Sequence, residues 1–145
     1  MIRRMQPGDL EQVLHLWYMG NQQAHPYLPR EYFERHLVPV RRALPGSEVY
    51  VQDADGMLQG FIGLADTYIA GIFVDAAFRS QGIGRNLLEA AKQNRRSLTL
   101  HVYQKNIRAV RFYLREGFSI FQYQWEAETG LAEWAMKWRK NPASQ

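Results

Sequence analysis

Two glycines, Gly82 and Gly84, stand one residue apart in the stretch RSQGIGR, residues 79–85. A glycine-bearing turn that leads from a strand into a helix can bind phosphate. The backbone N–H groups of the first helical turn point outward, the helix dipole favours anions, and no Cβ blocks the approach. Arg79 and Arg85 flank the glycines and could pair with phosphate oxygens. The glycines could also do no more than permit a tight turn.

The loop does not follow two better-known phosphate-binding patterns. A dinucleotide fingerprint that starts at Gly82 requires glycine at position 87, where Leu87 stands. A Walker loop requires Gly-Lys followed by Ser or Thr, and the sequence contains no such triplet. Any phosphate site at this loop therefore belongs to another class of protein.

A second stretch, NIRAVRFYLREGF at residues 106–118, places Asn106 at the start of a helical pattern and Tyr113 two turns further on. A phenol has an unperturbed pKa of about 10, so it is protonated at neutral pH and can donate to a developing anion. The alternative is that Tyr113, next to Phe112 on an amphipathic helix, only caps a core. No metal site is expected, because the chain has no cysteine and its histidines lack ligand spacing. These histidines are His15, His25, His36 and His101.

The composition of the 145-residue chain, 46% apolar and 22% charged, is typical of one soluble globular domain. We expect a single domain over residues 1–140 and a short tail, residues 141–145. No apolar run is long enough to span a membrane, no signal peptide is evident and cysteine is absent, so we expect a cytoplasmic protein. The net charge of +4 comes from scattered basic pairs. It suits a small phosphate-bearing ligand as well as nucleic acid.

The apolar periods predict helices at the front of the chain. Asp9 is a plausible N-cap for a helix that ends near Ala24, and a second helix runs from about Arg30 toward Leu44. Pro39 marks a kink or an end in that second helix. The remaining pattern predicts a first strand at 1–5 and a hairpin of two strands around the turn DADG at 53–56. Strands at 68–75 and 97–103 then alternate with helices at 82–94 and 107–117, the second of which is closed by Gly117. Two strands end the chain.

This order indicates one mixed α/β domain. The nearly unbroken apolar run at 68–75 predicts a strand covered on both faces. The aromatic-rich stretch from Phe118 to Trp138 is most simply explained as a packed sheet. A nucleic-acid platform would need interleaved basic residues, and this stretch has only Lys137, so we expect no nucleic-acid partner.

Together, IFVDAAFRSQGIG and NIRAVRFYLREGF resemble two motifs of the GNAT superfamily of N-acetyltransferases. The first is similar to its V-x-P-x-x-R-x-x-G-I-G motif and the second to its N-x-x-A-x-x-F-Y-x-x-x-G-F motif. The order of elements also matches, so the resemblance covers essentially the whole chain, and small enterobacterial members are the most similar. Ala76 departs from the pattern, because the family often has proline there.

The resemblance implies a mostly antiparallel mixed sheet, splayed between its fourth and fifth strands and flanked by about four helices. It implies acetyl-coenzyme A as co-substrate, with the pantetheine arm on the fourth strand and at Asn106, and the pyrophosphate on the glycine loop. The residues to which the resemblance assigns this ligand are Ile72, Phe73, Val74, Arg79, Ser80, Gln81, Gly82, Ile83, Gly84, Arg85 and Asn106. The Val74 N–H would polarise the thioester carbonyl.

The resemblance also implies the catalytic groups. Tyr113 would sit beside the sulfur and donate to the departing thiolate. Some family members have a glutamate base five residues before the motif asparagine, and His101 stands there in this chain. An imidazole, with an unperturbed pKa near ~6.5, could take the proton of the amine, and ordered water is the competing route. Without cysteine, direct transfer in a ternary complex is simpler than an acyl-enzyme.

The acceptor is predicted only as a primary amine, either a protein lysine or a small molecule. Its candidate contacts are His25, Tyr27, Glu133 and Trp134, each of which could be purely structural. The rival function is a non-catalytic acyl-coenzyme A binding or sensing module on the same fold. The oligomeric state stays open between monomer and homodimer.

Overall fold

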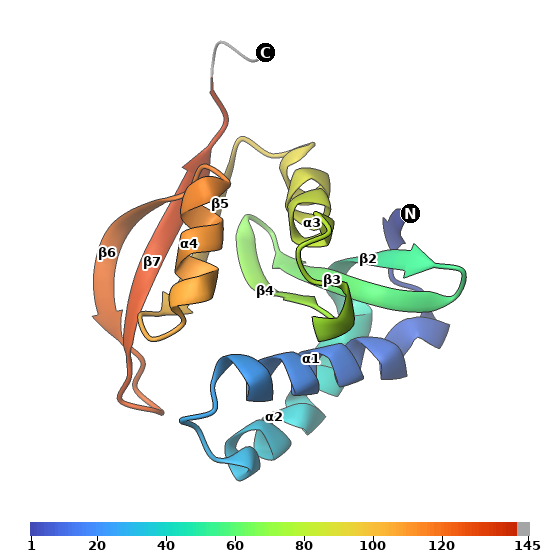
Figure 1. Cartoon of the computed structure of the whole chain (residues 1–145), viewed down its shortest axis with the longest axis horizontal. Helices are drawn as coiled ribbons and strands as arrows, with labels where there is room; N and C mark the ends of the chain where they lie inside the picture. Colours follow the sequence, from blue (N-terminus) through green and yellow to red (C-terminus); the bar gives the residue numbers. More distant parts are fainter. Residues whose placement is uncertain (142–145) are drawn as a thin grey trace.

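The computed structural model describes residues 1–141, which form one mixed sheet with helices on both faces (Figure 1). The described strands are β1 (Ile2–Arg4), β2 (Glu48–Ala54), β3 (Met57–Ala65), β4 (Tyr68–Val74), β5 (Ser97–Tyr103), β6 (Ser119–Trp125) and β7 (Ala132–Arg139). The described α-helices are α1 (Leu10–Ala24), α2 (Arg30–Ala43), α3 (Ile83–Lys92) and α4 (Ile107–Arg115). Of the predicted tail, residues 142–145 lie outside the described residues. None of the helices described is both long and apolar enough to cross a membrane.

The strand order is β1-β2-β3-β4-β5-β7-β6, and every neighbouring pair is antiparallel except β4 and β5. These two central strands are parallel and share a single residue pair, Tyr68 with Thr99. Beyond this pair they separate, as Figure 1 shows between the green β4 and the strand β5. The prediction of a mixed sheet splayed between its fourth and fifth strands is confirmed.

The hairpin of β2 and β3 follows from its turn residues. Asp55 and Gly56 both have positive φ, 53° and 90°, which is the backbone that a tight two-residue hairpin turn requires. The Asp53 carboxylate accepts the Gly56 N–H at 2.7 Å and fixes the turn. Alternate residues then face opposite sides of β3, so that Phe61 packs in one core and Ile62 in the other.

Each face of the sheet has its own core. α1 packs Val13, Leu14 and Leu16 against β2 and β3. On the opposite face, α3 contributes Leu87 and Leu88 to a larger core. This core extends to β5, β7 and the α4 residue Tyr113. The core on the α3 side therefore contacts strands on both sides of the β4–β5 boundary, from β3 to β7, and holds the two parts of the sheet together.

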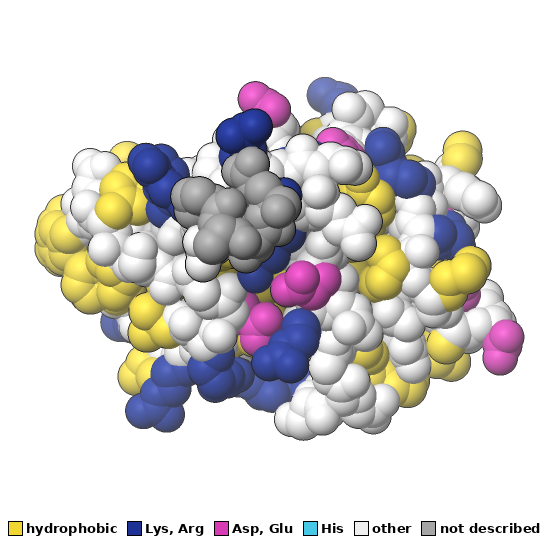
Figure 2. All heavy atoms as spheres, turned by 90° about the horizontal axis from the view of Figure 1, so that it is seen from above, with side chains coloured by type: hydrophobic (Ala, Val, Ile, Leu, Met, Phe, Trp, Pro, Cys, Tyr) yellow, Lys and Arg dark blue, Asp and Glu magenta, His cyan; other side chains and the backbone are white. Residues whose placement is uncertain are grey.

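The burial of two strands corrects the expectations from sequence. In β4 only Ile69 is buried, because the rest of the strand borders an opening rather than a covering helix. β6 is an edge strand whose aromatic residues are exposed, Phe121 by 55%, Tyr123 by 49% and Trp125 by 62%. Hydrophobic side chains gather on the left of Figure 2, the side where β6 lies in Figure 1. The packed-sheet explanation therefore holds for β7, which buries Ala135 and Met136, and is wrong for β6.

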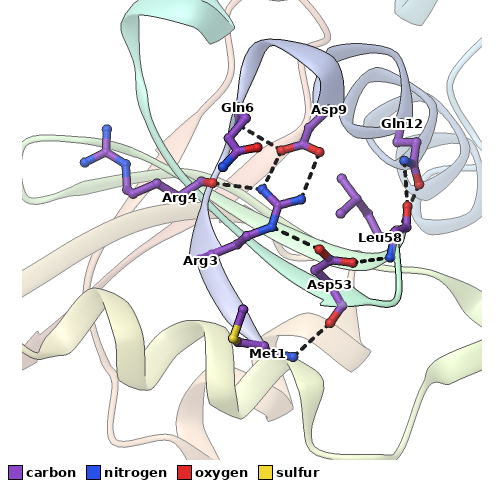
Figure 3. Close-up of polar contacts among 9 residues, drawn as sticks. Met1, Arg3, Arg4, Gln6, Asp9, Gln12, Asp53 and Leu58 are labelled. Atoms are coloured by element: carbon purple, nitrogen blue, oxygen red, sulfur yellow. Dashed lines mark hydrogen bonds and ion pairs between the residues drawn. The ribbon is translucent and has the colours of Figure 1, made fainter.

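Asp9 precedes α1 as predicted but makes no side-chain cap for that helix. Its carboxylate instead accepts two N–H groups of Arg3, at 2.7 and 3.0 Å, and the Gln6 backbone N–H at 2.8 Å (Figure 3). The Arg3 Nε also donates to Asp53 at 3.0 Å, so this network fastens β1 to its neighbours. With its oxygens occupied in this way, Asp9 caps the short 3₁₀ turn at Pro7–Asp9.

Of the two alternatives predicted at Pro39, an end of the helix is wrong, because α2 continues through this residue to Ala43. The proline ring lies on the exposed side of the helix. On the other side, Phe33 is buried, and Leu37 and Val40 pack against the core that α1 forms. This packing holds the helix together across the missing N–H of Pro39.

Candidate active site

A cleft of about 650 Å³ opens where β4 and β5 separate. A bulge in β4 helps to cause the separation. Gly63 of β3 pairs with Gly71, but Leu64 pairs with Ile69, so Ala70 is an extra residue that bends the strand. From Gly71 to Val74, β4 pairs with β3 on one side and has no β5 partner on the other. The backbone of Ile72, Phe73 and Val74 therefore has a free edge along the cleft.

The glycine loop closes one end of this cleft. Gly82 begins α3 with φ of 81°, and Ser80 also has a positive φ of 65°, which is uncommon for a residue with a side chain. The preceding 3₁₀ turn at Ala76–Phe78 forms without the family's proline, because the Asp75 carboxylate accepts the Ala77 N–H at 2.8 Å. The predicted cofactor residues that line the cleft are Ile72, Phe73, Val74, Arg79, Ser80, Gly82, Ile83, Gly84, Arg85 and Asn106; Gln81 does not line it.

The same end of the cleft is strongly cationic. Arg108 and Arg115 of α4 line it together with Arg79 and Arg85. Burial and the nearby Arg108 guanidinium lower the pKa of Arg79, which shows that two like charges face each other there. An anion between them would relieve this repulsion. Sequence reasoning missed Arg108 and Arg115, although their spacing of seven residues puts them on one face of a helix.

Tyr113 lies in the wall of the cleft and is only 7% exposed. Burial raises the pKa of its phenol, so the hydroxyl keeps its proton, and it has no hydrogen-bond partner among the described residues. At the start of the same helix, the Asn106 Oδ1 accepts the Ala109 N–H at 3.3 Å. This cap uses the oxygen of Asn106 and leaves its amide N–H groups free to donate into the cleft.

His101 also lines the cleft, on the exposed surface of β5. Its ring meets the Tyr68 ring edge-on, with centroids 5.4 Å apart. Tyr68 begins β4 and was missed by sequence reasoning, as was Tyr103 at the end of β5, which lines the cleft beside His101. Burial raises the pKa of both tyrosines. This end of the cleft is therefore walled by neutral aromatic side chains.

His25 lies at this aromatic end, between the rings of Phe33 and Tyr103. Its Nδ1 is 2.7 Å from the Tyr27 hydroxyl, so the two residues form one hydrogen-bonded unit. Burial lowers the pKa of His25 to about 4 and raises the pKa of Tyr27 to about 12. Both groups are consequently uncharged at neutral pH. Tyr27 contacts the cleft only through His25, since it does not itself line the cleft.

Of the two predicted contacts on β7, the structure brings one to the cleft. Glu133 pairs with Tyr103 across the ladder and lines the cleft. Trp134 does not, because adjacent residues of a strand point to opposite faces. Its ring packs against the core on the α3 side and meets Tyr123 at 6.0 Å between centroids. The structure therefore places Trp134 against the core and not in the lining of the cleft.

A mixed sheet opened between its two parallel strands, with a glycine loop closing one end of the opening, is the arrangement of the acetyltransferase fold. Residues 18–140 match the family model described as acetyltransferase (GNAT) domain. The chain belongs to this family, and the resemblance seen in its two motifs is confirmed.

Curated relatives agree with the family model. The chain is 35% identical over 140 residues to the peptidyl-lysine N-acetyltransferase YiaC of Escherichia coli, covering 95% of this chain and 96% of that protein. It is 31% identical over 121 residues to YjaB of the same organism, also a peptidyl-lysine N-acetyltransferase, covering 82% of each chain. The solution structure of apo YjaB superposes with a TM-score of 0.84 and 26% identity, covering 95% of this chain and 96% of that one.

The fold is also shared with PaiA N-acetyltransferase of Thermoplasma acidophilum, solved in complex with coenzyme A. That structure superposes with a TM-score of 0.80, at 18% identity and covering 97% of this chain and 98% of PaiA. Identity at this level supports the common fold alone.

Proposed function

We propose that this protein transfers an acetyl group from acetyl-coenzyme A to a primary amine, with both substrates bound at once. The observation that carries the proposal is the cleft itself. It runs along the unpaired edge of β4 from a cationic loop to the buried Tyr113. The peptidyl-lysine acetyltransferases YiaC and YjaB, and coenzyme A in the PaiA structure, support both halves of the reaction. The catalytic domain would span residues 1–140.

The chain offers a partner for each part of a long thioester. The free backbone of Ile72, Phe73 and Val74 would pair with the amides of the pantetheine arm, as an added strand pairs with a sheet edge. Outward N–H groups of residues 80–85 would hold the pyrophosphate. Arg79, Arg108 and Arg115 would neutralise its charge. The amide N–H groups of Asn106 would donate to the arm near α4.

The reaction forms one bond and breaks one. The amine nitrogen attacks the thioester carbonyl carbon, the C–N bond forms, and the C–S bond breaks. A protonated amine loses two protons overall, of which one ends on the thiol and one goes to solvent. The chain must therefore accept a proton from the amine, stabilise a carbonyl oxyanion and stabilise a thiolate. The Val74 N–H is our candidate for the oxyanion.

Tyr113 is proposed to stabilise the thiolate. Its burial keeps the phenol protonated throughout the working pH range. Because a phenol of raised pKa is a weaker acid than an ordinary thiol, we expect it to act by donating a strong hydrogen bond to sulfur as negative charge develops. His101 is our candidate for removing the amine proton, directly or through water, since it lines the aromatic end of the cleft.

The test is thiol release from acetyl-coenzyme A in the presence of a panel of lysine peptides and small amines. We expect Tyr113→Phe to lower kcat by about 10²-fold while leaving the KM for acetyl-coenzyme A nearly unchanged, the size expected of one lost donor to the leaving group. Tyr123→Phe, which changes an exposed tyrosine of β6 outside the cleft, is the matched control.

Three results would contradict the proposal in different places. A wild-type protein that fails to bind acetyl-coenzyme A in calorimetry would remove the function altogether. Binding without thiol release for any amine would instead indicate the rival, a non-catalytic acyl-coenzyme A module. Full activity of Tyr113→Phe would remove Tyr113 from the mechanism and leave the transferase reaction in place.

A further inference from the structure

Glu133 is a carboxylate held inside the cleft, at the end away from the cationic loop. It lies on β7 opposite Tyr103 and is only 9% exposed. The Gln124 side chain on β6 donates an N–H to its Oε1 at 2.9 Å. This bond fixes one oxygen of the carboxylate, and Oε2 has no hydrogen-bond partner among the described residues.

The charge of Glu133 is unbalanced within the described part of the chain. The cleft is lined by two carboxylates, Glu116 and Glu133. Glu116 pairs with the Arg85 guanidinium at 3.3 Å, whereas Glu133 has no ion-pair partner among residues 1–141. A buried carboxylate without a counter-ion is costly, and a cationic ligand bound beside it would relieve that cost.

The position of the carboxylate points to the acceptor rather than to the phosphates. Burial raises the pKa of Tyr68, on β4 across the split, and the nearby charge of Glu133 raises it further. Tyr68 and Tyr113, our proposed donor to sulfur, line the same cleft as Glu133. Glu133 therefore borders the cavity in which the thioester would react.

The side chains around Glu133 suit a primary ammonium. Tyr68, Tyr103 and His25 line this end of the cleft, and none of them carries a positive charge at neutral pH. Aromatic faces attract cations, and they also suit the methylene groups of an alkyl chain. An aromatic site with one carboxylate at its wall favours an alkylammonium over an anionic acceptor.

We propose that Glu133, oriented by Gln124, is the binding site for the protonated amine of the acceptor, which therefore enters as an alkylammonium such as a lysine side chain. This inference rests on the proposed function. The ammonium donates to the free Oε2 of Glu133 and then loses its proton to His101 or to water before it attacks. The roles are separate: Glu133 recognises the cation, and the base makes it nucleophilic.

The test measures how strongly the carboxylate is coupled to the ammonium. Two short capped alanine peptides, one with a central lysine and one with norleucine, differ only at the charged end of that side chain. Their affinities are measured in the presence of coenzyme A, which carries no acetyl group and permits no turnover. For the wild type we expect the lysine peptide to bind at least about tenfold more tightly. For Glu133→Gln we expect the two affinities to become equal.

Two further variants make the comparison specific. Glu128→Gln removes an exposed carboxylate that pairs with His36 at 2.9 Å outside the cleft, and it should keep the lysine preference. Gln124→Ala keeps the charge of Glu133 but frees its orientation, and it should lose part of the preference. In turnover assays Glu133→Gln should raise the KM for a lysine peptide by at least about tenfold and leave the KM for acetyl-coenzyme A unchanged.

The outcomes separate this inference from the proposed function. Equal binding of the two peptides to the wild type, or a lysine preference that survives in Glu133→Gln, overturns the role of Glu133 even when coenzyme A binds normally. Absence of coenzyme A binding to the wild type overturns the proposed function instead. An unchanged coenzyme A affinity of Glu133→Gln shows that this variant is folded. If Glu133→Gln does not fold, Gln124→Ala tests the same role, because it should lose part of the lysine preference.

Discussion

Gly82 and Gly84 stand together in the motif, but the structure needs them for different reasons. Gly82 has a left-handed backbone, and a Cβ built there meets nothing within 4 Å. The space that a side chain would occupy at this position therefore opens to the cleft. A Cβ at Gly84 would approach the Phe112 ring at 3.1 Å, so this glycine lets α3 pack closely against α4. Both glycines line the cleft, but only at Gly82 would an added side chain stand in open space.

We therefore predict that Gly82→Ala weakens binding of acetyl-coenzyme A by about tenfold, because its methyl group enters the open space where the phosphate would lie. Calorimetry on the purified protein measures the change. Gly84→Ala is the comparison, and we expect it to alter stability more than affinity. Equal loss of affinity in both variants would contradict this division of roles.

The motif residues could be predicted from sequence because their spacing alone brings them to one strand and two helix starts. Tyr68 and Arg108 could not, because their meeting in the cleft depends on how far β4 and β5 separate. The pair Glu133 and Trp134 shows the same limit more sharply. The period of a strand puts these neighbours on opposite faces, and only the register with β5 decides which of them reaches the cleft.

At the scale of elements, the cleft depends on how closely α1 approaches β4. The Phe73 ring packs toward α1, next to the Phe61 ring at 5.5 Å between centroids, while its backbone borders the cleft. A Cβ at Gly20 of α1 would lie 2.4 Å from the Phe73 ring, nearer than any side chain allows. Gly20 thus lets the helix and the strand touch.

Gly20→Ala should destabilise the protein although alanine favours helices. Helix propensity alone predicts a gain of up to about 1 kcal/mol, but overpacking against Phe73 costs about 1–3 kcal/mol. We expect a net loss of about 1 kcal/mol in the free energy of unfolding, measured by urea titration. The double variant Gly20→Ala, Phe73→Leu should recover part of that loss. A stabilised single variant would show that α1 and β4 can move apart without cost.

Most helices and strands could be predicted, because the spacing of apolar residues in each segment matches the helix or strand that the segment forms. The exceptions are the burial of β4 and β6. An apolar run predicts burial on both faces only when both are covered, and β4 borders a cleft. The stretch Ser119–Trp125 is as rich in aromatic residues as β7, yet its place at the sheet edge leaves Phe121 and Trp125 exposed. Position in the sheet, which the sequence does not encode locally, decided both outcomes.

At the scale of the whole molecule, buried titratable groups link stability to pH. The hydrogen bonds of Arg3 lower the pKa of Asp9, and the Arg95 ion pair lowers the pKa of Glu48. The Gly56 backbone N–H and then Arg3 lower the pKa of Asp53. Depressed carboxyl pKa values give stability that is present at neutral pH and is lost only as the pH falls below about 4. Any loss of folding stability between neutral pH and pH 4 must therefore come from another group.

His25 is the group from which we expect acid sensitivity in this range. Its pKa is about 4 in the folded protein, because burial disfavours the imidazolium, and about 6.5 in the unfolded chain. The unfolded state therefore binds more protons between these values, so stability falls as the pH drops from 6.5 toward 4. We expect His25→Gln to remove about 1–3 kcal/mol of this acid destabilisation, measured by urea titration at several pH values.

The control is His15→Gln, which changes an exposed histidine of α1 and should leave the slope of stability against pH unchanged. His25→Gln should be less stable than the wild type at pH 7, since the substitution disturbs the contact with Tyr27, yet it should lose less stability on acidification. Parallel curves for the wild type and His25→Gln between pH 6.5 and 4 would mean that His25 takes up its proton without unfolding. The wall that it forms with Tyr103 would then be open to water.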